Sequence, residues 1–317
     1  MRMDWKGKHF TVSGGAGFLG THVVEKLRER GAADVFVVRH AEYDIAREEE
    51  VVRLFREHPA DIVIHLAGLV GGILPNAERP ADFFYQNLMM GTLLLHHAWK
   101  SGVSRFIAAG AGCGYPEDAP RPLREADFWS GFPQKESAPY SLAKRLLTIQ
   151  SEAYQRQHGF VSVITIPGNI YGPYDNFNLL DAHVIPALVR KFVEAAAAGS
   201  PTVEVWGTGR AARDFVYAGD VAEGMLLALE RIDRSEVINL SSGVETSVRE
   251  VVELLGEITG YEGRIEWNTS RPDGQLHRCF DTSKATELLG WTPATPLRQG
   301  LEMTVKWYSE HQEEARR

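Results

Sequence analysis

An α/β fold is the fold class that the sequence predicts: a Rossmann-type, doubly wound parallel sheet with a smaller C-terminal substrate-binding part. Short apolar runs alternate with longer segments of helical pattern through the first half of the chain, as in a succession of βαβ units. A glycine-rich turn, Gly14-Gly-Ala-Gly-Phe-Leu-Gly20, connects the first apolar run to the first helical segment. Together these two observations favour a parallel sheet that binds a dinucleotide.

The first two units follow directly from the pattern. Residues 9–13 form an apolar run typical of a buried strand. The helix expected over residues 18–30 ends at Gly31, because glycine favours the left-handed conformation at a helix end. Residues 35–38 predict the second strand. The next helix is expected over residues 48–58, where a proline stops it.

The alternation continues to about residue 170. Residues 61–66, 105–109 and 161–166 predict three further strands, and a long helix is expected over residues 80–101. Beyond this region the pattern becomes irregular, with glycine and proline interrupting short segments. We expect residues 1–170 to form a dinucleotide-binding Rossmann domain. Residues 171–317 should form mainly a substrate-binding part, partly interleaved with the first.

Composition excludes several classes of function. A net charge of −8 leaves no basic field for nucleic acid, and no apolar run is long enough to span a membrane. The first ten residues lack the apolar region of a signal peptide. The two cysteines exclude a disulfide framework, so a cytoplasmic location is expected. No spacing typical of metal ligands occurs, and we expect no metal.

Tyr140 and Lys144 form a candidate acid–base pair. They stand four residues apart in a segment expected to be helical, so they share one helix face. An ammonium favours a phenolate, and we therefore expect Lys144 to lower the pKa of Tyr140. The spacing alone recurs by chance on exposed helices, but the glycine loop upstream strengthens the functional interpretation.

The glycine loop predicts the cofactor site. Gly14, Gly17 and Gly20 allow a tight turn, close approach of the backbone to a pyrophosphate, and close packing of helix against strand. Arg39 follows the second strand where an acid would select NAD, which indicates NADP and leaves NAD as the alternative. The other residues expected at the cofactor are Phe18, Leu19, Ala67, Tyr140 and Lys144.

Several longer segments resemble the extended short-chain dehydrogenase/reductase family, almost from end to end of the chain. The resemblance is greatest to its GDP-L-fucose synthase branch, the GDP-4-keto-6-deoxymannose 3,5-epimerase/4-reductases. The segments that carry it are Leu69–Ile73, Pro80–Asn87, Cys113–Pro116, Asn169–Phe177, His183–Pro186, Trp206–Gly209 and Arg271–Gly274.

The resemblance implies roles for individual residues. Tyr140 would protonate the C4 oxygen during hydride transfer, with Lys144 as its partner and as a ribose ligand. Cys113 and His183 would be the acid–base pair of epimerisation, because two groups on opposite faces of a sugar can move protons alpha to a ketone. On their own, Cys113 would also suit a small buried position, and His183 an ordinary helix start.

A GDP-hexose is the partner that the resemblance implies. Arginine and lysine suit a diphosphate, and arginine can bind it through two hydrogen bonds. Trp206 would equally suit packing in the core. The residues matching positions that hold the GDP part are Asn169, Lys191, Trp206, Arg213 and Arg278.

The chain departs from the family at its catalytic serine, because Ala111 stands at that position. Such a serine stabilises charge on the substrate oxygen, and loss of one such donor costs about 3–4 kcal/mol in comparable sites. Lys191 stands where the family has arginine, and Gly168 replaces a side chain before Asn169. These differences put reduction at C4 in question.

Three functions therefore stay open. The first is a GDP-hexose epimerase/reductase, and the second is a GDP-sugar isomerase without net redox change, either an epimerase or a pyranose–furanose mutase. The third is a non-catalytic dinucleotide-binding sensor. Related enzymes dimerise through two helices that correspond to residues 80–101 and the Tyr140 helix, so we expect a homodimer. In this chain the apolar residues of the two helices include Phe84, Leu88, Leu94, Leu95, Leu146, Leu147 and Ile149.

Overall fold

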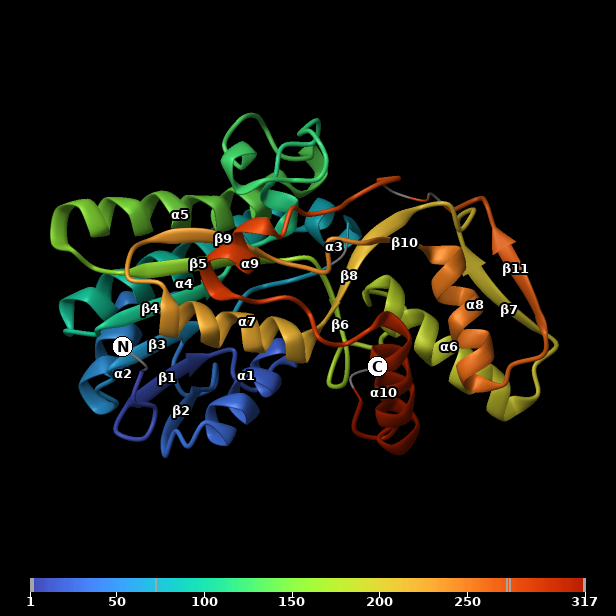
Figure 1. The fold of residues 1–317 in the computed structure, drawn as a ribbon, viewed down its shortest axis with the longest axis horizontal. Coiled ribbons are helices and arrows are strands. Elements are labelled where there is room, and N and C mark those ends of the chain that lie inside the picture. The colour runs from blue at the N-terminus through green and yellow to red at the C-terminus, as the bar shows by residue number, and fades with distance from the viewer. Residues whose placement is uncertain (1–2, 72, 272, 274, 316–317) are drawn as a thin grey trace.

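The larger sheet of the molecule has six strands, and every neighbouring pair is parallel (Figure 1). The computed structural model describes residues 3–71, 73–271, 273 and 275–315. In spatial order the strands are β2 (Asp34–Val38), β1 (His9–Ser13), β3 (Ile62–His65), β4 (Arg105–Ala109), β5 (Ser162–Pro167) and β9 (Glu236–Leu240). This order confirms the predicted doubly wound fold class.

Helices cover both faces of this sheet. On one face lie α1 (Phe18–Glu29) and α7 (Ala218–Arg231), which pack against each other, with the short α9 (Ser283–Leu289) beside α7. On the other face lie α2 (Glu48–Glu57), α4 (Pro80–Lys100) and α5 (Ala138–His158). Between β3 and α4 the chain forms the short α3 (Ile73–Glu78). A hydrophobic core therefore fills the space on each side of the sheet.

The smaller part of the molecule lies at the right of Figure 1. Its three-stranded sheet has the order β10 (Glu245–Ser247), β8 (Ala212–Tyr217), β6 (Asn169–Tyr171), and a parallel pair joins β7 (Thr202–Trp206) to β11 (Arg264–Asn268). Three helices, α6 (Val184–Ala198), α8 (Val248–Thr259) and α10 (Leu297–Glu310), enclose a separate core.

The helices and strands expected before residue 170 are all present, and each end lies within one residue of the expected position. The expected irregularity beyond residue 170 was wrong. Helices α6, α7, α8 and α10 have 12 to 15 residues each. The glycines there end helices instead of breaking them, since Gly199 and Gly260 take left-handed conformations after α6 and α8.

Residues 218–240 return from the smaller part to the larger sheet. They form α7 and then β9, the strand at one edge, so the sheet is completed by chain far from its start. The segment had no distinct strand pattern, because Glu236 and Val237 at its start are only half-buried at the sheet edge.

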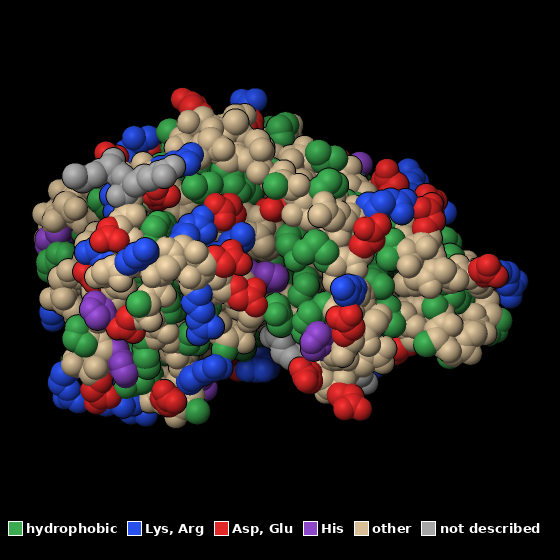
Figure 2. Space-filling view, turned by 60° about the horizontal axis from the view of Figure 1, so that its bottom comes forward, with side chains coloured by type: hydrophobic (Ala, Val, Ile, Leu, Met, Phe, Trp, Pro, Cys, Tyr) green, Lys and Arg blue, Asp and Glu red, His purple; other side chains and the backbone are tan. Residues whose placement is uncertain are grey.

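The surface carries charged side chains of both signs. On the face drawn in Figure 2, acidic and basic side chains are interspersed and form no continuous basic field. Among the described residues, no helix combines the length and the apolar character that crossing a bilayer requires. Within the same residues, no group of three or more His, Cys, Asp or Glu side chains is arranged to hold a metal ion.

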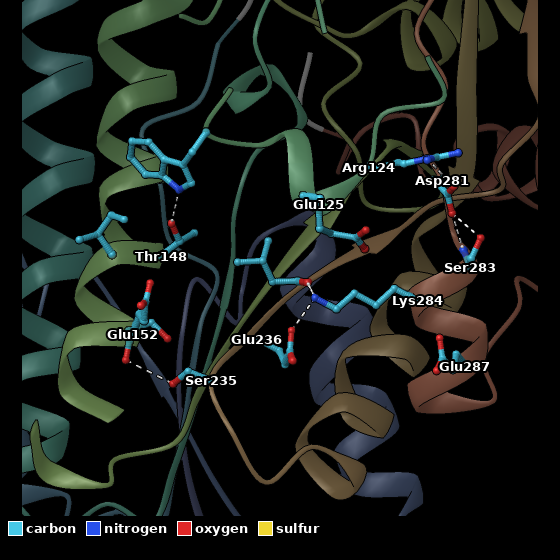
Figure 3. A pocket seen from close by; sticks show the side chains of 15 residues that line it. Arg124, Glu125, Thr148, Glu152, Ser235, Glu236, Asp281, Ser283, Lys284 and Glu287 are labelled. Carbon is cyan, nitrogen blue, oxygen red and sulfur yellow. Dashed lines mark hydrogen bonds and ion pairs between the residues drawn. The ribbon is translucent and has the colours of Figure 1, made fainter. Parts of the chain in front are cut away.

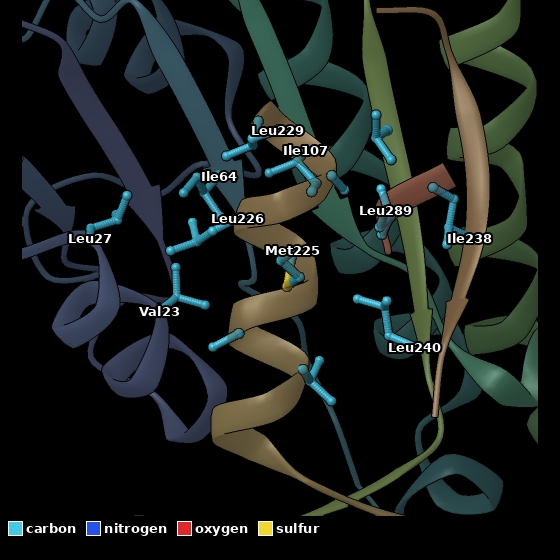
Figure 4. Close-up of a cluster of buried hydrophobic side chains, with 14 of the residues drawn as sticks. Val23, Leu27, Ile64, Ile107, Met225, Leu226, Leu229, Ile238, Leu240 and Leu289 are labelled. Carbon is cyan, nitrogen blue, oxygen red and sulfur yellow. The ribbon is translucent and has the colours of Figure 1, made fainter. Parts of the chain in front are cut away.

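Leu226 lies at the centre of the core between α7 and α1 (Figure 4). Its side chain is fully buried, so Leu226→Ala should lower the free energy of unfolding by about 2–5 kcal/mol. Urea unfolding measures the change. Val52→Ala on α2, where the side chain is 46% exposed, is the control and should stay within about 0.5 kcal/mol. Equal losses in the two variants would contradict this packing.

Candidate active site

The glycine loop lies at the carboxyl end of β1, where it meets the loop that follows β3. Gly14 has a φ of +73°, and a Cβ there would lie 2.5 Å from the amide nitrogen of Ala67. A Cβ on Gly20 would lie 2.0 Å from the carbonyl oxygen of Gly14. Both positions therefore exclude any larger residue, and the backbone of this loop is free to approach a ligand closely.

The first turn of α1 is suited to an anion. Gly17 precedes the helix without a side-chain cap, and no acidic residue occurs in the first turn, which includes Phe18 and Leu19. The N–H groups at this end carry partial positive charge, which favours a phosphate. The loop and helix end therefore fit the pyrophosphate of a dinucleotide.

Arg39 lies directly after β2, with its side chain exposed to solvent. In the described part of the chain it forms no ion pair with a carboxylate, although Glu42 is close in sequence. Its guanidinium is therefore available to an anionic ligand at this edge of the dinucleotide site.

Lys144 is buried on α5, and its Nζ donates a hydrogen bond to the carbonyl oxygen of Ala109 at 3.3 Å. Burial lowers the pKa of Lys144 to about 8, against an opposing effect of Cys113. Burial also raises the pKa of Tyr140 above its ordinary range, and negative charge on Cys113 raises it further. The expected lowering of the Tyr140 pKa by Lys144 is thus wrong for the protein alone, because desolvation of the phenolate dominates.

A polar layer beneath Lys144 was missed from the sequence. His65, at the end of β3, is fully buried, and its Nδ1 lies 2.7 Å from the hydroxyl oxygen of Ser13 on β1. Burial and then Lys144 lower the pKa of His65 to about 3, so the imidazole stays neutral. From α4, the Asn87 amide holds the backbone of Leu69 through two hydrogen bonds of 3.0 and 3.2 Å. The sequence indicated this layer only in that the mostly apolar strands β1 and β3 end in the polar residues Ser13 and His65.

Cys113 lies in the short 3-10 turn that follows β4 (Gly112–Gly114), and the buried Ala111 directly precedes this turn. It is close enough to act electrostatically on Tyr140, Lys144 and Arg278. The structure therefore brings together four of the residues predicted from the sequence.

Arg278 and Arg213 extend this group toward the smaller part of the molecule. Burial lowers the pKa of Arg278. Burial, followed by repulsion from Arg278, lowers the pKa of Arg213 to about 10. Among the described residues, no ion pair joins either arginine or Lys144 to a carboxylate. Glu245 and Asp273 act on Arg213 only from beyond ion-pair distance, so these three desolvated cations can serve as a site for an anionic ligand.

His183 precedes α6 as its N-cap residue. Its side chain is exposed to solvent, yet the surrounding protein lowers its pKa, with Asp181 opposing. No hydrogen bond or ion pair between described residues joins His183 to Cys113, so the structure leaves their pairing as a prediction.

Trp206 at the end of β7 is 50% exposed, which excludes the alternative of core packing. Two cations approach its ring: Lys191 Nζ lies 5.4 Å and the Arg271 guanidinium carbon 4.9 Å from the ring centroid. The ring edge is held by a 3.1 Å hydrogen bond from its Nε1 to Glu204. An exposed indole with two cations near its ring can offer a platform for a planar, anionic ligand group.

Gly168, a position where the resemblance leads one to expect a side chain, precedes Asn169 at the start of β6. A Cβ at position 168 would lie 1.9 Å from Ser241 Oγ. The hydroxyl group of Ser241 therefore occupies the space that a side chain at position 168 would need, and the two positions are coupled.

A separate cavity of about 780 Å³ lies over the exposed edge of β9 (Figure 3). Lys284 crosses it, with its Nζ 2.5 Å from Glu236 and 2.8 Å from the carbonyl oxygen of Val237. The backbone nitrogen of Asn239 donates to the Glu125 carboxylate at 2.8 Å. These side chains satisfy the backbone of the edge strand, and none of the predicted site residues lines this cavity.

The lowered pKa of Lys144 predicts a pH dependence of stability. The folded protein loses this proton near pH 8, whereas an unfolded lysine keeps it to about pH 10.4. Between these values the unfolded chain binds more protons, so the contribution of Lys144 to stability rises with pH. Relative to Lys144→Arg, which keeps its charge, the wild type should gain up to about 2 kcal/mol between pH 7.5 and 9.5. Parallel urea-unfolding profiles would contradict the buried ammonium.

Comparison with known families agrees with this geometry. Residues 10–241 match the family model described as the NAD dependent epimerase/dehydratase family. GDP-L-fucose synthase 1 of Arabidopsis thaliana is 38% identical over 306 residues, which cover 96% of this chain and 94% of that protein. GDP-L-fucose synthase of Escherichia coli K12 is 32% identical, with 96% and 98% covered.

Solved structures give the same result. A GDP-L-fucose synthetase from Naegleria fowleri bound to NADP superimposes with a TM-score of 0.92 at 26% identity, covering 100% of this chain and 97% of that one. A GDP-6-OMe-4-keto-L-xylo-heptose reductase from C. jejuni superimposes with a TM-score of 0.89 at 28% identity, covering 98% and 99%. The chain therefore belongs to the NAD dependent epimerase/dehydratase family, the extended short-chain dehydrogenase/reductases, as its sequence segments predicted.

Proposed function

We propose that the protein is a GDP-hexose epimerase/reductase that acts on a GDP-4-keto-6-deoxyhexose and uses NADP. The observation that carries this proposal is the single group of Tyr140, Lys144 and Cys113 beside the unpaired Arg213 and Arg278. An acid–base group next to an anion site is what a nucleotide-sugar enzyme requires. Relatives named as GDP-L-fucose synthases and GDP-heptose reductases support the substrate class.

For reduction, NADPH would supply the hydride. The Tyr140 phenol keeps its proton at neutral pH and can donate it to the C4 oxygen as charge develops there. Lys144 stays cationic below pH 8 and stabilises the phenolate that remains. The exposed, unpaired Arg39 suits the 2′-phosphate that distinguishes NADP from NAD.

For epimerisation, Cys113 and His183 would exchange protons at the carbons on either side of the keto group. Although its side chain reaches solvent, the surrounding protein desolvates the His183 ring and lowers its pKa, which favours the neutral imidazole that can accept a proton. A thiol on the other face of the sugar can donate one. The 4-keto group stabilises the carbanion as an enolate, so the protein mainly has to move protons.

The GDP part would lie along the smaller part of the molecule. Arg213 and Arg278 suit the diphosphate, since each presents donors in the geometry of phosphate oxygens. Trp206 suits stacking of the guanine, with Lys191 beside it. Asn169, at the start of β6, completes the proposed set of substrate ligands.

A second candidate, a GDP-sugar isomerase without net redox change, is favoured by Ala111. This residue is buried and offers no hydroxyl to the substrate oxygen. Thr165 does not replace it, because its Oγ1 donates to the carbonyl oxygen of Ala108 at 3.2 Å in the interior. Product of unchanged mass, formed from a GDP-hexose without NADPH, would identify this activity.

Two variants, each expected to lose a different one of the two proposed reactions, test the proposed function. With GDP-4-keto-6-deoxymannose and NADPH in D₂O, the wild type should consume NADPH and incorporate deuterium at C3 and C5. Tyr140→Phe should reduce NADPH consumption about 10²–10⁴-fold and retain deuterium incorporation, whereas Cys113→Ala should lose incorporation. Absorbance at the nicotinamide band and product NMR give the two readouts.

Tyr154→Phe, on the same helix and hydrogen-bonded to His96 at 2.5 Å, is the matched control and should retain both reactions. If the wild type neither consumes NADPH nor incorporates deuterium, the proposed function is wrong. Deuterium incorporation without NADPH consumption in the wild type would establish the isomerase instead.

We also propose a homodimer in which α4 and α5 of each subunit form the interface. Several apolar residues named from the sequence are buried against the sheet, namely Leu94, Leu95 and Leu147. Tyr85, Leu146 and Ile149 are 55%, 40% and 46% exposed and give these helices an outer apolar face. In sedimentation, Ile149→Glu should shift the protein from dimer to monomer. A monomeric wild type would overturn the proposal.

A further inference from the structure

Asp214 on β8 is a completely buried carboxylate that the proposed chemistry does not use. Its Oδ1 accepts hydrogen bonds from the backbone nitrogen and the hydroxyl of Ser242, at 2.8 and 2.6 Å. Its Oδ2 accepts from the backbone nitrogens of Gly243 at 3.0 Å and Phe280 at 3.1 Å. One side chain thus holds the turn after β9 and the segment around residue 280 against β8.

No cation balances this carboxylate among the ion pairs of the described residues. Its charge is stabilised instead by donors from backbone and hydroxyl groups, and such charge-assisted bonds are strong in a dry interior. A neutral side chain of the same shape could not accept all four. The site therefore specifically requires a carboxylate.

The segments that Asp214 joins carry Arg213 and Arg278, which are both half-buried. Arg213 is its neighbour on β8, and the backbone nitrogen of Asp214 donates to the carbonyl oxygen of Arg278 at 3.0 Å. Two residues before that contact, the Ala212 nitrogen donates to Leu276 at 2.7 Å, so residues 276–280 run alongside β8. The Asp214 carboxylate fixes the far end of this alignment through Phe280.

Arg213 and Arg278 repel each other, since both are cationic and desolvated and neither has a carboxylate partner in the described ranges. Left to themselves, two such groups would move apart toward water. Their backbones prevent this, and Asp214 is the group that secures one backbone against the other. Held close together, the two guanidiniums can bind adjacent phosphate groups without reorganising.

We propose that Asp214 is a positioning residue, which fixes Arg213 and Arg278 at the spacing that binds the diphosphate of the nucleotide sugar. The inference rests on the proposed function, because it assumes a nucleoside diphosphate ligand. Either arginine alone can bind a single phosphate. Asp214 should therefore matter mainly for the binding of ligands that carry a second phosphate.

Asp214→Asn tests this role, because it keeps the shape and turns one acceptor oxygen into a donor that faces other donors. Calorimetry with GDP and with GMP should show the Kd for GDP rising about tenfold or more, and the Kd for GMP rising less than about threefold. The Kd for NADPH should not change. A loss of structure alone would weaken GDP and GMP equally.

A double-mutant cycle with Arg278→Met separates positioning from general destabilisation. In that background Asp214→Asn should weaken GDP binding by less than about twofold, because the group it positions is already absent. Asp220→Asn is the matched control: Asp220 is also buried and accepts a backbone hydrogen bond from Thr295 at 2.9 Å, away from both arginines. It should leave the GDP/GMP ratio unchanged.

Should Asp214→Asn not fold, Ser242→Ala removes only the 2.6 Å hydroxyl donor and should weaken GDP about threefold more than GMP. If the wild type binds GDP no better than GMP, the proposed GDP-sugar function is overturned. If the wild type prefers GDP and the variants keep its GDP/GMP ratio, the positioning role of Asp214 is overturned while the proposed function stands.

Discussion

Desolvation of cations without acidic partners is the constraint on which this molecule depends. Lys144, Arg213 and Arg278 all lose water on folding, and burial lowers the pKa of each. Removing charge from water costs free energy that folding must offset elsewhere. The two hydrophobic cores on the faces of the large sheet and the third core of the smaller part supply that stability. The binding of an anion would then recover part of the cost.

The same desolvation sets the protonation of the acid–base group. In water an ammonium one helical turn away would favour the phenolate of Tyr140, but the dry site disfavours any new negative charge more strongly. The phenol therefore holds its proton until charge develops on a substrate. Below, His65 stays neutral, so it adds no second positive charge beneath Lys144. Burial therefore keeps the Tyr140 phenol protonated before any ligand is present.

Local sequence patterns predicted the sheet from β1 to β5 and the residues that meet at its carboxyl edge, because both depend on short-range periodicity and motif spacing. They did not reveal β9, since an edge strand with half-buried residues has no distinctive pattern. They also missed His65 and Asp214. Their roles arise from hydrogen bonds across 52 and 28 to 66 residues, which only the fold brings together. The raised pKa of Tyr140 could not be predicted either, because it depends on burial, and the four-residue spacing from Lys144 does not indicate burial.

The resemblance predicts side chains that this sequence lacks at two positions, Gly168 and Ala111. A neighbouring side chain fills the space at only the first of them. At Gly168 the lost side chain is replaced in space by the hydroxyl of Ser241, which a Cβ there would meet at 1.9 Å. Thr165 does not supply the hydroxyl that Ala111 lacks, because its own hydroxyl donates a hydrogen bond to the backbone within the sheet. In the proposed reduction, stabilisation of a developing oxyanion would therefore fall on Tyr140, which burial keeps protonated. In the proposed chemistry, hydride transfer and enolate formation both place negative charge on the C4 oxygen, so a site with one donor in place of two would slow both steps.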